Sequence, residues 1–293
     1  MGYADTLVKI RRPDSVNVYP TYPGYNQQPG KRNYLDLELS VEFANSAVPN
    51  YWVRVDTPVV VDSGGHSHSH TSPRRPVGRF IHPIISTDTT DTLLSQTDSN
   101  GKLRFRYVAS QFSGVERIRA KLLSDTTISD TLSLITRVPG LQLLPEGNHY
   151  VKVGGTCEHH GPRDDALYQN CRTPDSDHWG TQTLIQNIQT IADSFAVSYS
   201  GFRLRVNDLS LKYGGGFDIF GRWLTDITPP GCRPAGFGHC EHRTGDSGDV
   251  SFIVINPQGK NTGITDPQKR KLLDLITNVS GAPKRHTDHY HIR

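Results

Sequence analysis

The 293-residue sequence has few cysteines, little net charge and no long apolar run. Its four cysteines form no Cys-x-x-Cys pair, which argues against a zinc knuckle built from cysteines. A formal net charge of +3 is too small to indicate a nucleic-acid partner. No apolar stretch has the length of about 20 residues that a membrane-spanning helix requires. These absences leave a globular chain that is long enough for two domains.

The cysteines form two local pairs, Cys157 with Cys171 and Cys232 with Cys240. This spacing favours two disulfides that each close a loop, with reduced cysteines packed as small apolar side chains as the alternative. Disulfides indicate a secreted, periplasmic or cell-surface protein. Because Met1–Asp5 lacks the basic and apolar pattern of a signal peptide, we expect that a leader has been removed.

The first half of the chain is predicted to be an antiparallel β-sandwich. Leu35–Phe43 alternates almost strictly between apolar and polar residues, which is typical of a strand with one buried face. Further strands are predicted at 51–55, 59–61, 103–108, 115–122 and 132–136. Proline-rich residues 1–34 read as an extended lead-in, and Pro139–Gly147 reads as a linker. We therefore predict domains at 1–140 and 141–293.

One stretch of this first domain resembles the bacterial immunoglobulin-like repeats of surface proteins. The resemblance rests on the turn Thr97–Gly101, on Phe105 and Tyr107, and on the segment from Ser113 to Ala120. It covers about a third of the domain, and many β-sandwiches share such turns. It implies a spacer or an adhesive module without chemistry of its own.

The second half is predicted to be an α+β domain. A helix over 180–199 places apolar side chains on one stripe, and a second helix has strong end signals. These signals are Thr265 as N-cap, Pro267 at the first helical position, Gln268 closing a capping box and Gly281 at the stop. Strands are expected at 202–207 and 250–255.

Histidines gather at several places, and only two of them suit a metal. The alternating histidines of Gly65–His70 lie in a loop rich in glycine and serine, and we interpret them as solvated. His159 and His160 are adjacent, and adjacent side chains rarely converge on one ion, so we interpret them as surface residues, with a place at the rim of a substrate site as the alternative. The remaining places are His239–Asp249 and His286–His291.

These two segments predict a metal site with three protein ligands, His242, Asp249 and His291. Imidazole and carboxylate together suit zinc, and catalytic zinc sites use three protein ligands. We expect a strand–turn–strand arrangement in which Gly245 and Gly248 let the chain fold tightly between His242 and Asp249.

The pattern resembles the zinc D-alanyl-D-alanine metallopeptidases and the penicillin-insensitive murein endopeptidases, whose fold is shared with the hedgehog signalling domain. Their signature, His-x-x-Gly-x-x-x-Asp followed much later by His-x-His, is met by His242, Gly245 and Asp249 and then by His289 and His291. The stretch from Asn207 to Leu211, followed by Gly214 and Gly215, also looks like the murein endopeptidases, and His239 has a counterpart there. The resemblance covers about residues 178–293.

What the resemblance implies is zinc held by His242, Asp249 and His291, with His289 as the acid/base. His239 would be a near neighbour, and Asp208 or Ser210 would shape the substrate groove. The chain departs from several relatives at Cys240, where they have serine. Some relatives use a glutamate as base at the position of Asp288, so the base is either His289 or Asp288. The residue that binds a substrate carboxylate is not transferable, and the candidates are Arg205, Arg222 and Arg243.

Two functions follow as expectations. The first is a zinc-dependent peptidase that acts on a peptidoglycan cross-link or on D-alanine-containing peptides of the cell wall. The second is a zinc-stabilised binding or adhesion protein of the cell surface without turnover, because a fold can keep its site and lose its reaction. Neither involves nucleic acid or a membrane span, and the sequence does not set the oligomeric state.

Overall fold

The computed structural model describes residues 6–21, 30–62, 76–86, 88–153, 177–216, 239–285 and 289–293, with no side-chain description at 59–62 and 239–241. These residues form mainly strands, together with two α-helices. They divide into two compact units, of which unit 1 runs to Arg137 and unit 2 begins at Val138. The described helices include none that is both long and apolar enough to cross a membrane.

Among its described residues, unit 1 contains ten strands and no helix. The strands are β1 Thr6–Ile10, β2 Asn17–Val18, β3 Tyr34–Phe43, β4 Ser46–Ala47, β5 Trp52–Asp62, β6 Arg79–Ile81, β7 Leu93–Gln96, β8 Lys102–Val108, β9 Gly114–Leu122 and β10 Ser129–Thr136.

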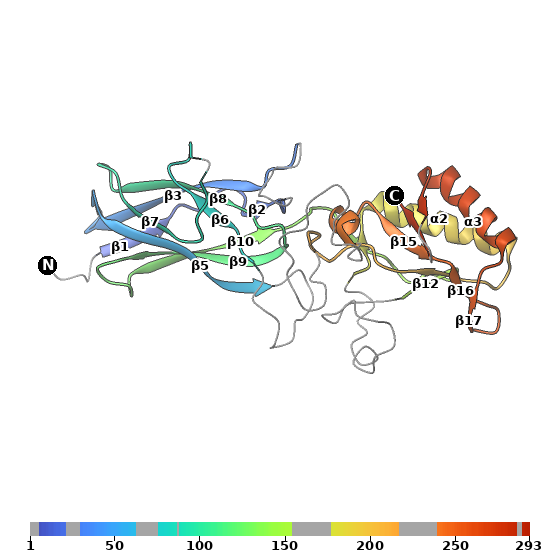
Figure 1. Cartoon of the computed structure of the whole chain (residues 1–293). Coiled ribbons are helices and arrows are strands. Elements are labelled where there is room, and N and C mark those ends of the chain that lie inside the picture. The colour runs from blue at the N-terminus through green and yellow to red at the C-terminus, as the bar shows by residue number, and fades with distance from the viewer. Residues whose placement is uncertain are drawn as a thin grey trace. The chain divides into compact units, whose positions relative to one another are not determined.

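These strands form two sheets that pack face to face, as Figure 1 shows. One sheet has the order β1-β3-β8-β6 with β4 beside β3, and the other has the order β2-β10-β9-β5-β7. All pairs are antiparallel except β2 with β10. Leu39 and Phe105 from the first sheet share one core with Ile118 and Leu134 from the second. Unit 1 is therefore a β-sandwich.

The alternating pattern of Leu35–Phe43 is confirmed, because every second residue of β3 is buried against the second sheet. Three other predicted strands also form, as β8, β9 and β10. The strands predicted at 51–55 and 59–61 are instead one strand, β5, whose register shifts between Asp56 and Val59. Residues 1–34, which we expected to be an extended lead-in, contribute two strands to the sandwich, β1 and β2.

Among its described residues, unit 2 contains two α-helices, one 3₁₀ helix and nine strands. They are β11 Gln142–Leu143, β12 Tyr150–Lys152, β13 Trp179–Gly180, α2 Gln182–Ser198, β14 Leu204–Val206, the 3₁₀ helix η3 His239–Thr244, β15 Gly248–Ser251, β16 Ile253–Ile255, β17 Asn261–Gly263, α3 Asp266–Ser280, β18 Lys284–Arg285 and β19 His289–Ile292.

A five-stranded sheet with the order β12-β14-β15-β19-β18 forms the centre of unit 2. Helices α2 and α3 lie side by side against it (Figure 1). The core between helices and sheet contains Leu184 and Ile188 of α2, Leu272 of α3, and Val250 and Tyr290 of the sheet. The apolar stripes predicted for both helices are thus the surfaces that they bury.

Both helices begin at threonine caps. The Thr181 side chain accepts a hydrogen bond from the Leu184 amide at α2. At α3, Thr265 and Gln268 form the predicted capping box, and Gly281 ends the helix at a φ of 85°. Pro267 occupies the second helical position rather than the first, because Asp266 is the first residue after the cap.

The linker predicted at Pro139–Gly147 is wrong for its central residues. Gln142 and Leu143 pair with β13, and Leu144 is fully buried in the core of unit 2. Several other expectations fall outside the described residues: the histidine loop Gly65–His70, the pair His159 and His160, and the cysteines Cys157, Cys171 and Cys232 with the Cys240 side chain.

Candidate metal centre

Two neighbouring strands of the central sheet place Asp249 and His291 directly opposite each other. In the antiparallel register of β15 and β19, Asp249 faces His291 and Val250 faces Tyr290. Because side chains alternate across a strand, Val250 and Tyr290 point into the core under the helices, and Asp249 and His291 point to the other face. The β15–β19 pairing thus brings together residues 42 positions apart.

The third predicted ligand, His242, lies in η3 rather than in the expected strand. Gly245 follows the 3₁₀ helix at a φ of +69° and turns the chain toward β15, a conformation that glycine adopts without strain. Gly248 lies where an added Cβ would be 3.0 Å from the Leu209 side chain. The two glycines therefore let the chain fold tightly between His242 and Asp249, as the sequence predicted. The tight turn joins a 3₁₀ helix to a strand rather than two strands.

A glycine-rich turn that contains Gly214 and Gly215 contacts the backbone of η3. The Gly215 amide donates to the Arg243 carbonyl at 2.8 Å, next to His242 in the chain. A Cβ added to Gly214 would lie 2.8 Å from the same carbonyl oxygen and 2.5 Å from the Val138 side chain. Only glycine fits this position, and the turn holds the backbone of η3 in place.

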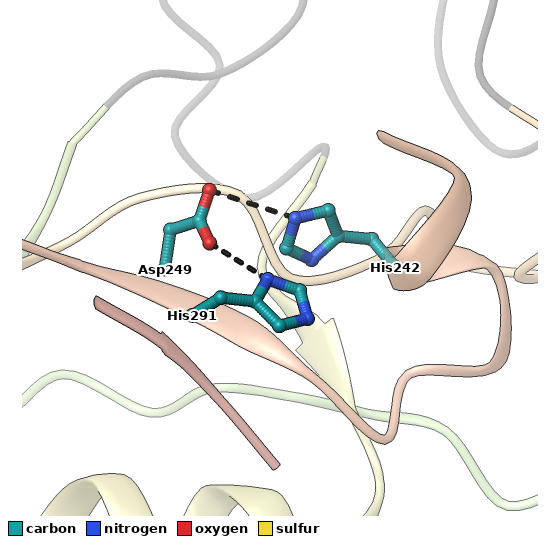
Figure 2. A group of neighbouring side chains, drawn as sticks. All are labelled: His242, Asp249 and His291. Carbon is teal, nitrogen blue, oxygen red and sulfur yellow. Dashed lines mark hydrogen bonds and ion pairs between the residues drawn. The ribbon is translucent and has the colours of Figure 1, made fainter. Parts of the chain in front are cut away.

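Figure 2 shows His242 and His291 with their rings turned toward the Asp249 carboxylate. His291 Nδ1 lies 3.0 Å from Asp249 Oδ1, and His242 Nε2 lies 3.5 Å from Asp249 Oδ2. The two rings meet edge to face with centroids 4.9 Å apart. We call these three residues the metal group, since one ligand atom from each lies within 4.8 Å of the others and the group is suited to hold a metal ion.

Burial and mutual attraction shape the charges of the metal group. Burial by itself raises the pKa of Asp249, but His242 and His291 outweigh it and hold that pKa well below its ordinary value. Burial by itself lowers the pKa of His242, but the Asp249 carboxylate outweighs it and raises that pKa. In the metal-free protein the Asp249 carboxylate therefore favours the protonated form of His242, and a cation would replace that proton.

The donor atoms lie close enough to share one metal ion. The two Asp249 carboxylate oxygens lie 3.0 Å from His291 Nδ1 and 3.5 Å from His242 Nε2, and one ligand atom of each residue lies within 4.8 Å of the others. His242 Nδ1 lies 3.2 Å from the Ser247 carbonyl oxygen. When Nδ1 donates its proton there, Nε2 keeps a lone pair for a metal, as metal-binding histidines usually arrange.

His289 lies beside the metal group without belonging to it. It is two residues from His291 on β19, so both side chains leave the same face of the sheet. Its Nε2 lies 3.4 Å from Asp249 Oδ2, and its side chain is 23% exposed, against 2% for His242 and 3% for His291. It is thus the histidine of the cluster that solvent reaches most easily.

The residues predicted to support the site are buried. Asp208 is 3% exposed, and its carbonyl oxygen accepts the Asp249 amide at 3.1 Å. Ser210 is fully buried and Arg243 is 6% exposed. Asp288, Arg222 and the side chain of His239 lie outside the described residues, so their predicted roles stay predictions.

A buried pair, Asp177 and His178, was not predicted from the sequence. His178 Nδ1 lies 2.8 Å from Asp177 Oδ1, and its Nε2 lies 3.1 Å from the Val206 carbonyl oxygen. Burial raises the pKa of Asp177, and the nearby Asp208 carboxylate adds to the rise although His178 opposes it. Burial lowers the pKa of His178, but Asp177 outweighs it and the pKa is raised. An aspartate followed directly by a histidine forms no periodic or spaced pattern, so the sequence alone does not mark this pair as a buried ion pair.

Comparisons with known proteins leave the family open. No family model matches the chain, and no curated protein matches its sequence. The adhesin InvE of Yersinia pseudotuberculosis matches with 11% identity over 99% of this chain and 70% of that one, at a TM-score of 0.37.

Two further solved structures match part of the chain. A C-terminal intimin fragment in complex with the intimin-binding domain of the translocated intimin receptor has 13% identity and a TM-score of 0.26, over 47% of this chain and 36% of the fragment. A conjugative transposon lipoprotein from Bacteroides eggerthii has 12% identity and a TM-score of 0.25, over 45% of this chain and 97% of its own. This chain therefore spans about a third of the intimin fragment, and scores this low support no assignment of fold or function.

Proposed function

We propose that unit 2 is a zinc-dependent amide hydrolase that acts on a peptidoglycan cross-link or on a D-alanine-containing peptide. The observation that carries the proposal is the convergence of His242, Asp249 and His291, with a more exposed histidine, His289, beside them. Three ligands of this kind leave one position of a tetrahedral ion for water or substrate. The substrate class comes from the sequence resemblance to the D-alanyl-D-alanine metallopeptidases and murein endopeptidases.

The metal group would hold the ion, and His289 would move the proton. Zinc, when bound, acts as a Lewis acid on a carbonyl oxygen and makes water a nucleophile near neutral pH. His289 would accept a proton from the attacking water at a ring nitrogen and pass it to the leaving amine, a role that contributes about 10²–10⁴-fold. Asp288 is the other candidate for this base. Ser247 would keep His242 in the tautomer that presents Nε2.

The proposal is tested by separating metal content from turnover. His289→Ala should keep about one zinc per chain and lose hydrolysis of cross-linked peptidoglycan fragments by about 10²-fold or more. His291→Ala should lose the zinc and the activity together. His149→Ala is the matched control, because His149 is a half-exposed histidine of the same unit that pairs with Asp193 at 2.8 Å and lies outside the metal group.

If His289→Ala keeps full activity, the assignment of the base is wrong and Asp288→Asn is the next variant to measure. If wild-type protein loaded with zinc cleaves neither peptidoglycan fragments nor D-amino-acid peptides, the hydrolase proposal fails. If His291→Ala retains zinc at full occupancy, the ligand set is wrong.

A second function is supported by the burial of the metal group. His242, Asp249 and His291 are 1%, 6% and 4% exposed, and an ion held by side chains this deeply buried would stabilise the fold whether or not it acts on a substrate. In this case unit 2 is a zinc-stabilised binding or adhesion domain without turnover. Removal of zinc would then lower the melting temperature of a protein that shows no hydrolase activity.

We infer that unit 1 is an immunoglobulin-like module and that the chain works in the periplasm, at the cell surface or outside the cell. The two packed sheets of unit 1 support the first inference. The cysteine spacing supports the second, through the proposed pairs Cys157–Cys171 and Cys232–Cys240. Mass spectrometry of peptides from unreduced protein would detect these pairs, and four free thiols would contradict them.

A further inference from the structure

The outer face of one sheet of unit 1 carries a row of cations. Arg117, Arg119 and Lys121 alternate along β9 with buried residues, so all three side chains leave the outer face. Successive members of the row are about 6.7 Å apart along the strand. Arg54 on β5 lies directly opposite Lys121 and adds a fourth cation.

Few carboxylates balance this row. The ion pairs that the described residues form on this face all use Asp56, which contacts Arg54 at 3.0 Å and Arg119 at 3.2 Å. Arg117 and Lys121 have no carboxylate partner among the described side chains. The face therefore has a surplus of positive charge that solvent screens in the free protein.

The outer face of the other sheet shows the opposite arrangement. There Lys102 and Arg104 of β8 both contact Glu38 of β3, at 3.0 and 2.8 Å. Arg106 contacts Asp36 at 2.6 Å in the same way. Cross-strand pairing of this kind is the ordinary arrangement of charges on a sheet, so the unbalanced row on β9 is a local feature and not a general property of the sandwich.

Hydroxyl groups run beside the cations. Thr131 and Ser133 of β10 lie opposite Arg119 and Arg117 in the register, and both are exposed. Together with Pro58, these four residues line an open hollow of about 430 Å³. The hollow offers guanidinium groups and hydroxyl groups to one ligand, which is the donor set that a carboxylate or phosphate on a hydroxyl-rich chain would use.

An apolar platform lies at the end of the same face. Trp52 is 47% exposed, and it lies two residues before Arg54 on β5, so its ring leaves the sheet on the same side. Leu123, whose amide donates to the Trp52 carbonyl, and Leu94, which lies opposite Arg54, are also exposed. An exposed tryptophan with apolar neighbours is a common contact surface for a flat ligand such as a sugar ring.

We propose that this face, which we call the β9 face, binds an anionic polysaccharide. The cation row fits its carboxylate or phosphate groups, the hydroxyl row fits its hydroxyl groups, and Trp52 fits the apolar side of a sugar ring. Single-stranded nucleic acid is a poorer fit, because such sites place aromatic side chains between the cations and here Trp52 stands at one end. An anionic membrane is also a poorer fit, because it would need apolar side chains across the face, and here Trp52, Leu94 and Leu123 lie at one end while the cation and hydroxyl rows are polar. The inference does not depend on the metal group.

The test measures binding of the full-length protein to polygalacturonate, with uncharged dextran as the neutral polymer. Wild type should bind polygalacturonate, dextran should bind far more weakly, and added salt should weaken the charged interaction. Arg117→Gln combined with Lys121→Gln should weaken binding about tenfold. Neither residue is in an ion pair with a described residue, so this double variant should melt within a few degrees of wild type.

The control is Lys102→Gln combined with Arg104→Gln, which makes the same change in net charge on the other sheet. It should change the affinity by less than about twofold. Trp52→Ala should weaken polygalacturonate binding by about fivefold or more, and its melting temperature is measured alongside.

Four outcomes overturn the proposal. They are the absence of polygalacturonate binding, equal loss in the two double variants, an unchanged affinity in Trp52→Ala, and tighter binding to a thymidine oligonucleotide or to vesicles of anionic phospholipid than to the polysaccharide. Selective loss in the β9-face variants, with little binding of oligonucleotide and vesicle, supports it.

Discussion

Replacing Gly214 by alanine tests how tightly the glycine-rich turn holds η3. The residue has a φ of +70°, and an added Cβ would lie 2.8 Å from the Arg243 carbonyl oxygen and 2.8 Å from the Val138 Cβ. Neither atom can move by side-chain rotation alone. Gly259 is the matched control, because its φ is +75° and an added Cβ would meet nothing within 4 Å.

The two substitutions share one cost and differ in another. The left-handed backbone conformation costs an L-residue about 1 kcal/mol, and both variants incur this cost. Overpacking adds about 1–3 kcal/mol and applies to Gly214→Ala alone. We therefore expect the free energy of unfolding to fall by about 1 kcal/mol in Gly259→Ala and by about 2–4 kcal/mol in Gly214→Ala. Because the displaced carbonyl belongs to the residue after His242, zinc affinity should also fall in Gly214→Ala but not in Gly259→Ala.

Urea denaturation followed by tryptophan fluorescence measures the difference. Of the three tryptophans, Trp52 alone belongs to unit 1, so a Trp52→Phe background makes the signal specific for unit 2. Equal losses in the two variants would refute the reasoning, because the contact with the Arg243 carbonyl would then contribute nothing beyond the backbone conformation.

Three further predictions concern the same unit. Thr265→Ala should lower the free energy of unfolding by about 1 kcal/mol in urea denaturation, because it removes the capping box of α3, and Thr262→Ala on β17 is the control. In the metal-free protein, the raised pKa of His242 stabilises the fold fully below its unfolded-state value near 6.5, and this is lost as pH rises through the folded-state pKa. The stability margin of metal-free wild type over His242→Gln should therefore shrink with rising pH in urea titrations, while zinc affinity rises. The lowered pKa of Asp249 stabilises the fold above about 3.8 and is lost as pH falls through its folded-state pKa, so the margin over Asp249→Asn should persist at pH 5 and shrink only under strong acid.

Local signals made much of the fold predictable from sequence. The alternation of Leu35–Phe43 and the capping box at Thr265 each depend on residues within one element, and both are found in the structure. What the sequence did not reveal depends on distant partners. The short strand β1 forms because β3 offers it an edge, and residues 142–144 join unit 2 because β13 pairs with them.

The candidate site likewise has some parts that local spacing predicts and others that depend on distant contacts. The spacing of His289 and His291 predicted that both side chains share one face once the segment is extended, and β19 is such a strand. The η3 helix was not predicted, because His239–Thr244 lacks a periodic pattern and is held by contacts with the glycine-rich turn. The pairing of Asp177 with His178 could not be predicted, because it depends on their burial, which removes water from both side chains.

The separation between Asp249 and His291 has a consequence for biosynthesis. A ribosome that has translated Asp249 must still add β16, β17, α3 and β18 before it reaches His291. Until then the nascent chain presents only His242 and Asp249 of the metal group, too few of its donors to capture a cation firmly. If the metal group binds an ion, loading therefore follows translation of β19, and the metals available where the finished chain resides would decide which ion it receives.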